Sequence, residues 1–320
     1  MARAMKRFLV GCIALVLASS MLSTTASAQP AEFSFGVIGD AFREKSEEAA
    51  LREAIAASDR DNLGFVVVNG LKSRAEACTE AVYARRKSLF DTAKNGLVLS
   101  LGASDWIECK DEADRSAAVR HLNRVRETFF LDEFSLGASR IPLSRQSTGA
   151  KFRNYSENAR WEIGEILFAT INLPANNNNY QIEAGRNNEF EERLIANRDW
   201  LQRIFTTAAS KKMTGIVLFC DGNPLAAPGL LDRVNPVSRR DGFKEIRQQI
   251  AVLSEKYPGR VLVIHGQPAA AEAGANSITW RGRVGELGVG AGWVKLNVNP
   301  AQPSLFMTGR KVAEPGDAGQ

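Results

Sequence analysis

The chain has 320 residues, of which 44% are hydrophobic and 24% are charged, with 26 Gly and 11 Pro. These fractions are ordinary for a globular protein and exclude collagen-like, coiled-coil and wholly disordered chains. The formal net charge is +5, and the only two histidines are His121 and His265. The chain is therefore a poor candidate for an enzyme that needs several imidazoles for metal binding or proton transfer.

The first 28 residues have the three parts of a secretory signal peptide. Lys6 and Arg7 give a basic start, residues 8–18 are an apolar run, and a small polar segment ends in an A-x-A cleavage site at Ala28. The apolar run is too short to cross a bilayer of about 30 Å. We therefore predict a periplasmic or secreted protein with no membrane span after cleavage.

Removal of this segment also changes the charge balance. It takes away three of the 41 basic residues and none of the 36 acidic ones, which leaves 38 against 36. The basic pI of the whole chain is therefore no indication of a nucleic-acid partner, and we expect none.

Three cysteines, Cys78, Cys109 and Cys220, remain after cleavage. In an oxidising compartment two of them can pair. We expect Cys78 in a helical segment after the second strand and Cys109 just after the third strand. Because adjacent strands bring their following loops together, we predict a Cys78–Cys109 disulfide. Cys220 ends an apolar run and is predicted to be a small buried core residue.

Strands and helices alternate along the rest of the chain. Apolar runs closed by Gly or polar residues predict strands at 33–38, 65–68, 97–101, 166–172, 215–219 and 261–265. Helical spacing of apolar residues predicts helices at 44–57, 75–92, 112–128, 189–210 and 242–256. Two shorter strands are expected at 293–298 and 304–308. This order favours one layered α/β/α or α/β/β/α domain over residues 29–313, followed by a disordered tail at 314–320.

Two segments have both a structural and a binding interpretation. Residues 143–161 carry several Arg and Lys residues among polar and aromatic ones. We interpret them as a surface loop, with a polyanion groove as the alternative. Residues 176–179 are four consecutive asparagines, a pattern typical of a solvated turn, with a ligand-binding loop as the alternative.

Polar residues follow six of the predicted strands at their carboxyl ends. In a parallel sheet, ligands bind beyond that edge. The residues at these ends are Asp40, Asn69, Gly70, Ala103, Ser104, Asp105, Asn172, Asp221, Asn223, His265 and Gln267. Oxygen-rich clusters of this kind suit hard divalent cations or phosphate, so a ligand site is predicted at this rim.

Other chemistries have less support in the sequence. A serine hydrolase elbow of the form G-x-S-x-G is absent, and His121 falls in a charged helical stretch expected to be solvated. The first strand leads into Gly39-Asp40 and not into a dinucleotide-binding G-x-G-x-x-G turn. Zinc-finger spacing is absent as well.

Three strand ends resemble the first blocks of calcineurin-like metallophosphoesterases. They are residues 35–40 (FGVIGD), 65–73 (FVVVNGLKS) and 102–109 (GASDWIEC). The third block is similar to that of a secreted bacterial branch, which reads much like GDNEWTDC. Further matching stretches follow in the same order at 126–130, 144–147, 155–161, 168–178 and 263–266. The resemblance covers about residues 33–308 and implies an α/β/β/α sandwich of two sheets with helices outside, together with the Cys78–Cys109 disulfide.

The resemblance also implies a reaction, which uses two metal ions about 4 Å apart, bridged by an aspartate, to hydrolyse phosphate esters. Asp40 matches the aspartate of the first block. However, the bridging aspartate falls at Gly70, and three of the family's histidines fall at Phe42, Asn172 and Ala269. Without a carboxylate between them, two dications would repel each other strongly at this distance. We therefore expect no two-metal centre.

Two functions follow as alternatives. In the first, the protein keeps the phosphoesterase fold, has lost the two-metal reaction, and acts by binding a phosphorylated small molecule or a protein partner. In the second, it hydrolyses phosphate esters through a single divalent ion (Mn, Fe, Zn or Mg). The residual metal-ligand candidates are Asp40, Asp105, Asp221 and His265, and the candidate substrate-binding residues are Asn172, Asn176 and Asn177. For His265, a structural hydrogen bond at a strand end is the alternative that we favour.

Overall fold

The computed structural model describes residues 31–39, 42, 48–181, 187–226, 241–267, 277–290 and 292–309. The predicted signal segment 1–28 and the predicted tail 314–320 lie outside the described residues. The predicted metal ligand Asp40 lies outside them as well, as does Ala269, where the resemblance places a histidine.

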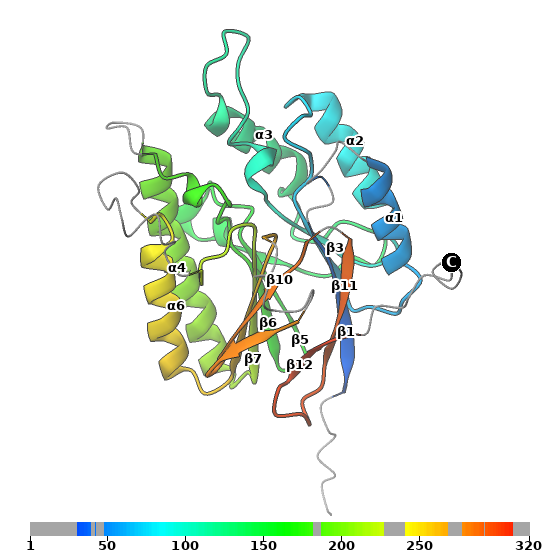
Figure 1. The fold of residues 1–320 in the computed structure, drawn as a ribbon, viewed down its shortest axis with the longest axis vertical. Helices are drawn as coiled ribbons and strands as arrows, with labels where there is room; N and C mark the ends of the chain where they lie inside the picture. The colour runs from blue at the N-terminus through cyan, green and yellow to red at the C-terminus, as the bar shows by residue number, and fades with distance from the viewer. Residues whose placement is uncertain are drawn as a thin grey trace, which may run out of the picture.

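Two β-sheets pack face to face, and helices cover the outer face of each (Figure 1). The first sheet has the order β12-β11-β1-β2-β3, formed by Phe306–Thr308, Trp293–Val298, Phe33–Ile38, Val66–Asn69 and Leu97–Ser100. The second has the order β4-β5-β6-β7-β8-β10-β9, formed by Ser144–Arg145, Ala159–Ile163, Ile166–Thr170, Gly215–Cys220, Arg260–His265, Val284–Gly288 and Thr279–Arg281. The predicted α/β/β/α sandwich is confirmed.

Two groups of helices form the outer layers. The first sheet is covered by α1 (Glu48–Ser58), α2 (Glu80–Asp91) and α3 (Ala118–Phe129), and the second by α4 (Asn188–Ser210) and α6 (Lys244–Lys256). Strands β1, β2 and β3 run parallel to one another, as do β6, β7, β8 and β10. Their carboxyl ends therefore form two neighbouring rims, which is where the ligand site was predicted.

The central strands are apolar over most of their length because each of their faces is covered. In β2, Val67 packs into the layer between the sheets, while Val66 and Val68 pack against the helices. Phe65 and Phe168 lie edge to face in the middle layer, with ring centroids 4.8 Å apart. A strand buried on both faces has no polar positions to alternate with, which is why these strands appear in the sequence as short continuous apolar runs.

Two predicted helices begin later than their apolar spacing indicates. Helix α2 begins at Glu80, because Thr79 caps it by accepting the N–H of Val82 at 3.3 Å. Cys78 therefore lies in the preceding loop, and its prediction as a helical residue was wrong. Helix α3 begins at Ala118, because Asp111 accepts backbone N–H groups further along the chain and holds that segment in a turn.

The surface-loop interpretation of residues 143–161 was wrong for the two ends of the segment, whereas the middle has turns with Lys151 and Arg153 exposed. The segment contributes β4 and the start of β5, which pair in antiparallel register, and two 3₁₀ turns lie between them. Its basic residue Arg145 is buried and donates to the backbone carbonyls of Asp132 and Ser156. Buried backbone groups need partners, and the short strand pair provides them.

The predicted Cys78–Cys109 disulfide is present, and Cys220 is buried with a free thiol, as predicted. None of the helices in the described ranges combines the length and the apolar character that a bilayer crossing requires.

We predict that the disulfide contributes substantially to stability, because it links positions separated by 31 residues. Closing a loop of this length restricts the unfolded chain and is worth about 3–4 kcal/mol. The double variant Cys78→Ser/Cys109→Ser should lose about that much free energy of unfolding in urea titrations. The control is the same titration in a strong reductant, where wild type and variant should coincide. Equal stability of the two proteins under oxidising conditions would contradict the prediction.

Candidate functional site

The carboxyl ends of the parallel strands of both sheets lie next to each other, and we call this shared edge the rim. Asp105 follows β3, Asp221 follows β7, and His265 ends β8, beside Cys220 in the strand register. The N–H of Gly266 donates to the carbonyl of Asp221 at 3.1 Å. The structure therefore brings together three of the four predicted metal ligands, the fourth being Asp40.

Asp105 is fully buried and is surrounded by backbone amides. Its Oδ1 accepts the N–H groups of Leu71 at 2.9 Å and Lys72 at 3.3 Å, and its Oδ2 accepts the N–H of Gly102 at 2.7 Å. Burial raises the pKa of Asp105 to about 7, against the lowering effect of these hydrogen bonds. The carboxyl group thus joins the loop after β2 to the loop after β3.

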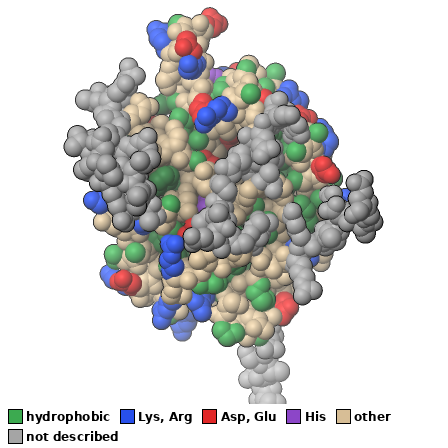
Figure 2. All heavy atoms as spheres, in the orientation of Figure 1, with side chains coloured by type: hydrophobic (Ala, Val, Ile, Leu, Met, Phe, Trp, Pro, Cys, Tyr) green, Lys and Arg blue, Asp and Glu red, His purple; other side chains and the backbone are tan. Residues whose placement is uncertain are grey.

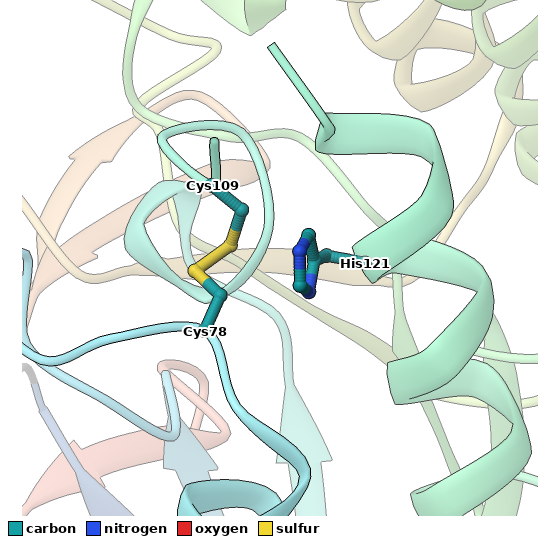
Figure 3. Close-up of side chains that lie close together, drawn as sticks. All are labelled: Cys78, Cys109 and His121. Atoms are coloured by element: carbon teal, nitrogen blue, oxygen red, sulfur yellow. A yellow bond between two sulfur atoms is a disulfide. The ribbon is translucent and has the colours of Figure 1, made fainter. Parts of the chain in front are cut away.

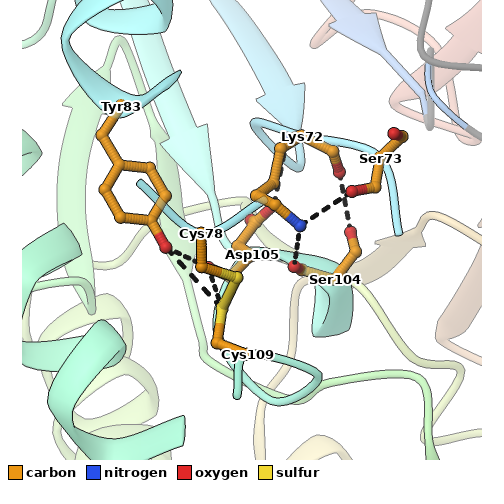
Figure 4. Close-up of a disulfide and its surroundings, with 7 residues drawn as sticks. All are labelled: Lys72, Ser73, Cys78, Tyr83, Ser104, Asp105 and Cys109. Atoms are coloured by element: carbon orange, nitrogen blue, oxygen red, sulfur yellow. Dashed lines mark hydrogen bonds between the residues drawn. A yellow bond between two sulfur atoms is a disulfide. The ribbon is translucent and has the colours of Figure 1, made fainter. Parts of the chain in front are cut away.

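Lys72 lies beside this carboxyl group and was missed by the sequence analysis. Its side chain is buried, and Nζ donates to the carbonyls of Ser73 at 2.7 Å and Ser104 at 2.9 Å (Figure 4). Burial lowers the pKa of Lys72, and the nearby Asp105 opposes this effect. The available signal was its position two residues after Gly70, inside the block that resembles the family. An ammonium bound to carbonyls at this place stabilises the loops.

Asp221 links the rims of the two sheets. Its Oδ2 accepts the N–H of Ala103, in the loop after β3, and the N–H of Ala175, in the loop after β6, both at 2.8 Å. Hydrogen bonds from backbone amides to a carboxylate are charge-assisted and strong. Asp221 therefore acts in the described structure as a joint between the two halves of the sandwich.

His265 is buried, and both ring nitrogens face protein groups. Nδ1 accepts the N–H of Gln267 at 3.3 Å, which assigns the ring proton to Nε2. Nε2 lies 3.5 Å from Oε1 of Glu286 in β10, without hydrogen-bond geometry. Contact with His265, supported by Asn223, lowers the pKa of Glu286. Glu286 was not predicted, because it lies within a strand and not after one.

A cavity of about 10 Å³ lies between the sheets beneath this rim. Its polar lining comes from Asn69, Ser100, Cys220 and His265. Among the described residues, both side-chain polar atoms of Asn69, the hydroxyl of Ser100 and Nε2 of His265 have no hydrogen-bond partner. A cavity of this size has room for about one water molecule.

The residues around this cavity do not fit a divalent cation. Asn69 and Ser100 carry no charge, and burial raises the pKa of the Cys220 thiol, whose Sγ donates to the carbonyl of Gly222 at 3.2 Å. A dication taken out of water needs negatively charged ligands to offset the loss of hydration. The two described acids of the rim, Asp105 and Asp221, direct oxygens to backbone amides instead.

The asparagine segment is a turn, as predicted, but it is only partly solvated: Asn176 is exposed and Asn177 is half-buried, while Asn178 and Asn179 are buried. Asn177, Asn178 and Asn179 all have positive φ angles of 54–56°, a left-handed conformation that asparagine tolerates better than most residues. Asn176 accepts the N–H of Asn179 at 3.3 Å, and Asn177 accepts the N–H of Gly242 at 2.9 Å. The two predicted substrate-binding side chains thus take part in holding this turn together.

The fully buried side chain of Arg193, from α4, holds this turn through several hydrogen bonds. Its guanidinium donates to the side chain and the carbonyl of Asn178, to the carbonyl of Asn172 and to Glu189. The side chain of Asn172, the third predicted substrate-binding residue, donates to Glu157 at 3.0 Å. Sequence spacing gave no signal for Arg193, because it occupies an ordinary position in an amphipathic helix.

A different set of three metal-binding side chains does come together in the described residues. Sγ of Cys78, Sγ of Cys109 and a ring nitrogen of His121 all lie within 4.8 Å of one another (Figure 3). His121 is half-buried and faces the disulfide, so its prediction as a solvated residue of a charged helix was wrong. Burial lowers the pKa of His121, and the cations Arg120, Lys72 and Arg124 lower it further.

Comparisons with known proteins give limited results. No protein-family model and no curated protein sequence matches this chain. Among solved structures, it is similar to a crystal structure described as a novel phosphatase from Mycoplasma pneumoniae, with 9% identity and a TM-score of 0.40. The similarity covers 85% of this chain and 89% of that one. At this identity the similarity does not extend to individual site residues.

We predict that Asp105 makes stability depend on pH in a characteristic direction. Its pKa rises from 3.8 to about 7 on folding, so the folded chain binds this proton more tightly than the unfolded chain. Its contribution to the free energy of unfolding should therefore fall as pH rises through this window, by up to about 1.4 kcal/mol per pH unit. Asp105→Asn should remove this slope in urea titrations.

The difference in unfolding free energy between wild type and Asp105→Asn should thus decrease from acidic to neutral pH. Asp91→Asn is the matched control, because Asp91 is an exposed helix residue that pairs only with Lys87 among the described contacts. Its difference from wild type should stay nearly constant. A constant difference for Asp105→Asn as well would show that Asp105 does not titrate in this window.

Proposed function

We propose that this protein is a periplasmic or secreted binding protein with a phosphoesterase-type fold that has lost two-metal hydrolysis. The single observation that carries the proposal is the use of the rim carboxylates. Asp105 directs both oxygens to backbone amides, and Asp221 directs one oxygen to two amides on different sheets. An oxygen that already accepts such hydrogen bonds is a poor ligand for a metal ion.

The absence of the aspartate that would bridge two metal ions also supports the loss of two-metal hydrolysis. Gly70, where the resemblance places the bridging aspartate, has a φ of +82° and no side chain. A Cβ built on it would lie 3.8 Å from Oδ1 of Asp105, so this position faces the buried carboxyl group. The chain keeps the loop geometry next to Asp105 but lacks the carboxylate that would hold two ions together.

Export is supported by the predicted signal segment and by the Cys78–Cys109 disulfide, which is typical of oxidising compartments. We propose a phosphorylated small molecule or a protein as the binding partner. On the face drawn in Figure 2, Lys and Arg side chains are separated by neutral and acidic ones and form no continuous band among the residues drawn in colour.

The second candidate is hydrolysis of phosphate esters through a single divalent ion. The observation that favours it is the contact of His265 with Glu286, next to Asp221 on the neighbouring strand. An imidazole and two carboxylates are suitable ligand types for Mn, Fe, Zn or Mg. However, this candidate needs the hydrogen bonds of Asp221 and the tautomer of His265 to change.

We expect purified wild-type protein to hold no stoichiometric divalent metal and to show no turnover of an aryl phosphate above the uncatalysed rate with Mn, Fe, Zn or Mg. Metal content and product release measure the two quantities. Asp221→Asn and His265→Gln should leave both unchanged. Stoichiometric metal together with turnover that either substitution abolishes would establish the second candidate in place of the first.

A second experiment restores the missing acid. We expect the double variant Asn69→Gly/Gly70→Asp to bind Mn²⁺ at least about tenfold more tightly than wild type, because a new carboxylate would face Asp105 and a dication would offset their repulsion. The positive φ should cost this variant about 1 kcal/mol of stability. Asn69→Gly alone is the matched control and should not gain affinity in calorimetric titrations. Equal affinity in all three proteins would contradict a lost phosphoesterase centre at this rim.

A further inference from the structure

The disulfide and His121 are brought together by three separate segments. Cys78 lies in the loop before α2, Cys109 follows the 3₁₀ turn at Ala103–Asp105, and His121 lies in the first turn of α3. Their ligand atoms lie within 4.8 Å of one another. Cys78 and His121 are half-buried, and Cys109 is buried, so the group opens to solvent on one side.

The position of His121 beside Cys109 does not depend on the bond between the sulfurs. The N–H of Ala117 donates to the carbonyl of Cys109 at 2.8 Å, and the N–H of His121 donates to the carbonyl of Ala117 at 3.0 Å. The hydroxyl of Tyr83 donates to the carbonyl of Asp105 at 3.1 Å and lies 3.8 Å from Sγ of Cys109. Backbone hydrogen bonds therefore hold two of the three ligands in place by themselves.

Cys78 is held by helix α2, whose position does not depend on the disulfide either. It directly precedes Thr79, the N-cap of α2, whose side chain accepts the N–H of Val82. Helix α2 in turn packs beside α3, and Tyr83 of α2 lies near His121 of α3, with ring centroids 6.4 Å apart. Opening of the disulfide leaves both sulfurs attached to segments that are anchored by other contacts.

We propose that Cys78, Cys109 and His121 are a redox-gated zinc site, closed in the oxidised chain and able to bind one Zn²⁺ when the disulfide is reduced. Two thiolates, one imidazole and one water are a known tetrahedral ligand set for zinc. Tetrahedral bonds of these lengths place the ligand atoms about 3.5–4 Å apart. The imidazole is already within reach, and the sulfurs need to separate by about 2 Å. This proposal does not rest on the function proposed for the rim.

The chemistry balances with a dithiol as reductant. The dithiol gives two electrons and two protons to the Cys78–Cys109 bond, so that two thiols form in the protein and the reductant becomes a disulfide. Zn²⁺ then replaces the two thiol protons, which pass to solvent. Two thiolates and one dication are neutral overall, so the surrounding cations Arg120, Lys72 and Arg124 do not oppose the bound site as a whole.

The test uses the mature full-length chain in two states, oxidised and reduced, with excess reductant removed under anaerobic conditions. Zinc affinity is measured by competition with a chromophoric chelator. Co²⁺ serves as a spectroscopic probe, because thiolate ligands and tetrahedral geometry give distinctive absorption bands. We expect about one equivalent of metal in the reduced chain and none at the same site in the oxidised chain.

Substitutions identify the ligands. His121→Gln should weaken zinc binding to the reduced chain by more than about tenfold while both thiols remain titratable. Cys78→Ser/Cys109→Ser should bind no zinc in either state. Circular dichroism before and after reduction checks that the fold is kept, since the proposal requires the ligand frame to remain in place.

Several outcomes would overturn the proposal. One is equal zinc binding by the oxidised and reduced chains, and another is no binding by the reduced chain. Loss of the fold on reduction would also contradict it, as would loss of binding through His265→Gln instead of His121→Gln. The last result would assign the metal to the rim, and metal binding there would bear on the proposed function and not on this site.

Discussion

The arrangement of the rim depends on a buried carboxyl group that accepts backbone amides from two loops. Asp105 takes the N–H groups of Leu71, Lys72 and Gly102, which have no strand partner once β2 and β3 end. Buried N–H groups without acceptors cost about 1–3 kcal/mol each, and this carboxyl group supplies acceptors for three of them. Asp221 extends the same principle across the sandwich, since its amide donors belong to different sheets.

This use of acids determines what the rim can do chemically. A carboxylate can bridge metal ions or fix backbone amides, and the same oxygen does not serve both roles well. In this chain Asp105 and Asp221 fix the backbone, while the polar lining of the cavity beneath them comes from Asn69, Ser100, Cys220 and His265. Within the described residues the rim is therefore a structural joint. The binding role that we propose needs a stable surface more than a set of charged ligands.

The sequence predicts the sandwich well because strands buried on both faces appear in the sequence as apolar runs. Strands covered on both faces are apolar at most of their positions, so β1, β2, β3, β6, β7 and β8 were all found close to their observed bounds. Helix starts were predicted less well, since Thr79 and Asp111 decide them through local side-chain hydrogen bonds that apolar spacing does not record. The short strands of residues 143–161 carry no apolar run, and their pairing depends on partners elsewhere in the chain.

A site residue could be predicted only where its residue type and its place after a strand were enough to indicate its role. An aspartate after a strand looks the same in a sequence whether it holds a metal or a backbone amide, so the role of Asp105 required its donors to be seen. Lys72 and Arg193 are buried cations whose acceptors are carbonyls and asparagines of distant segments, and no local pattern marks them.

His121 is the clearest case of a residue whose contacts could not be predicted from the local sequence. Its neighbours in the sequence are charged, and that pattern indicates a solvated helix face. The later start of α3 and the hydrogen bond from Ala117 to Cys109 turn this residue toward the disulfide instead. Two cysteines could be paired from strand order alone, but a third ligand depends on where a helix begins. Because hydrogen bonds of Asp111 and Ala117 set that start, a group able to bind metal can arise or disappear without any change in the three residues that form it.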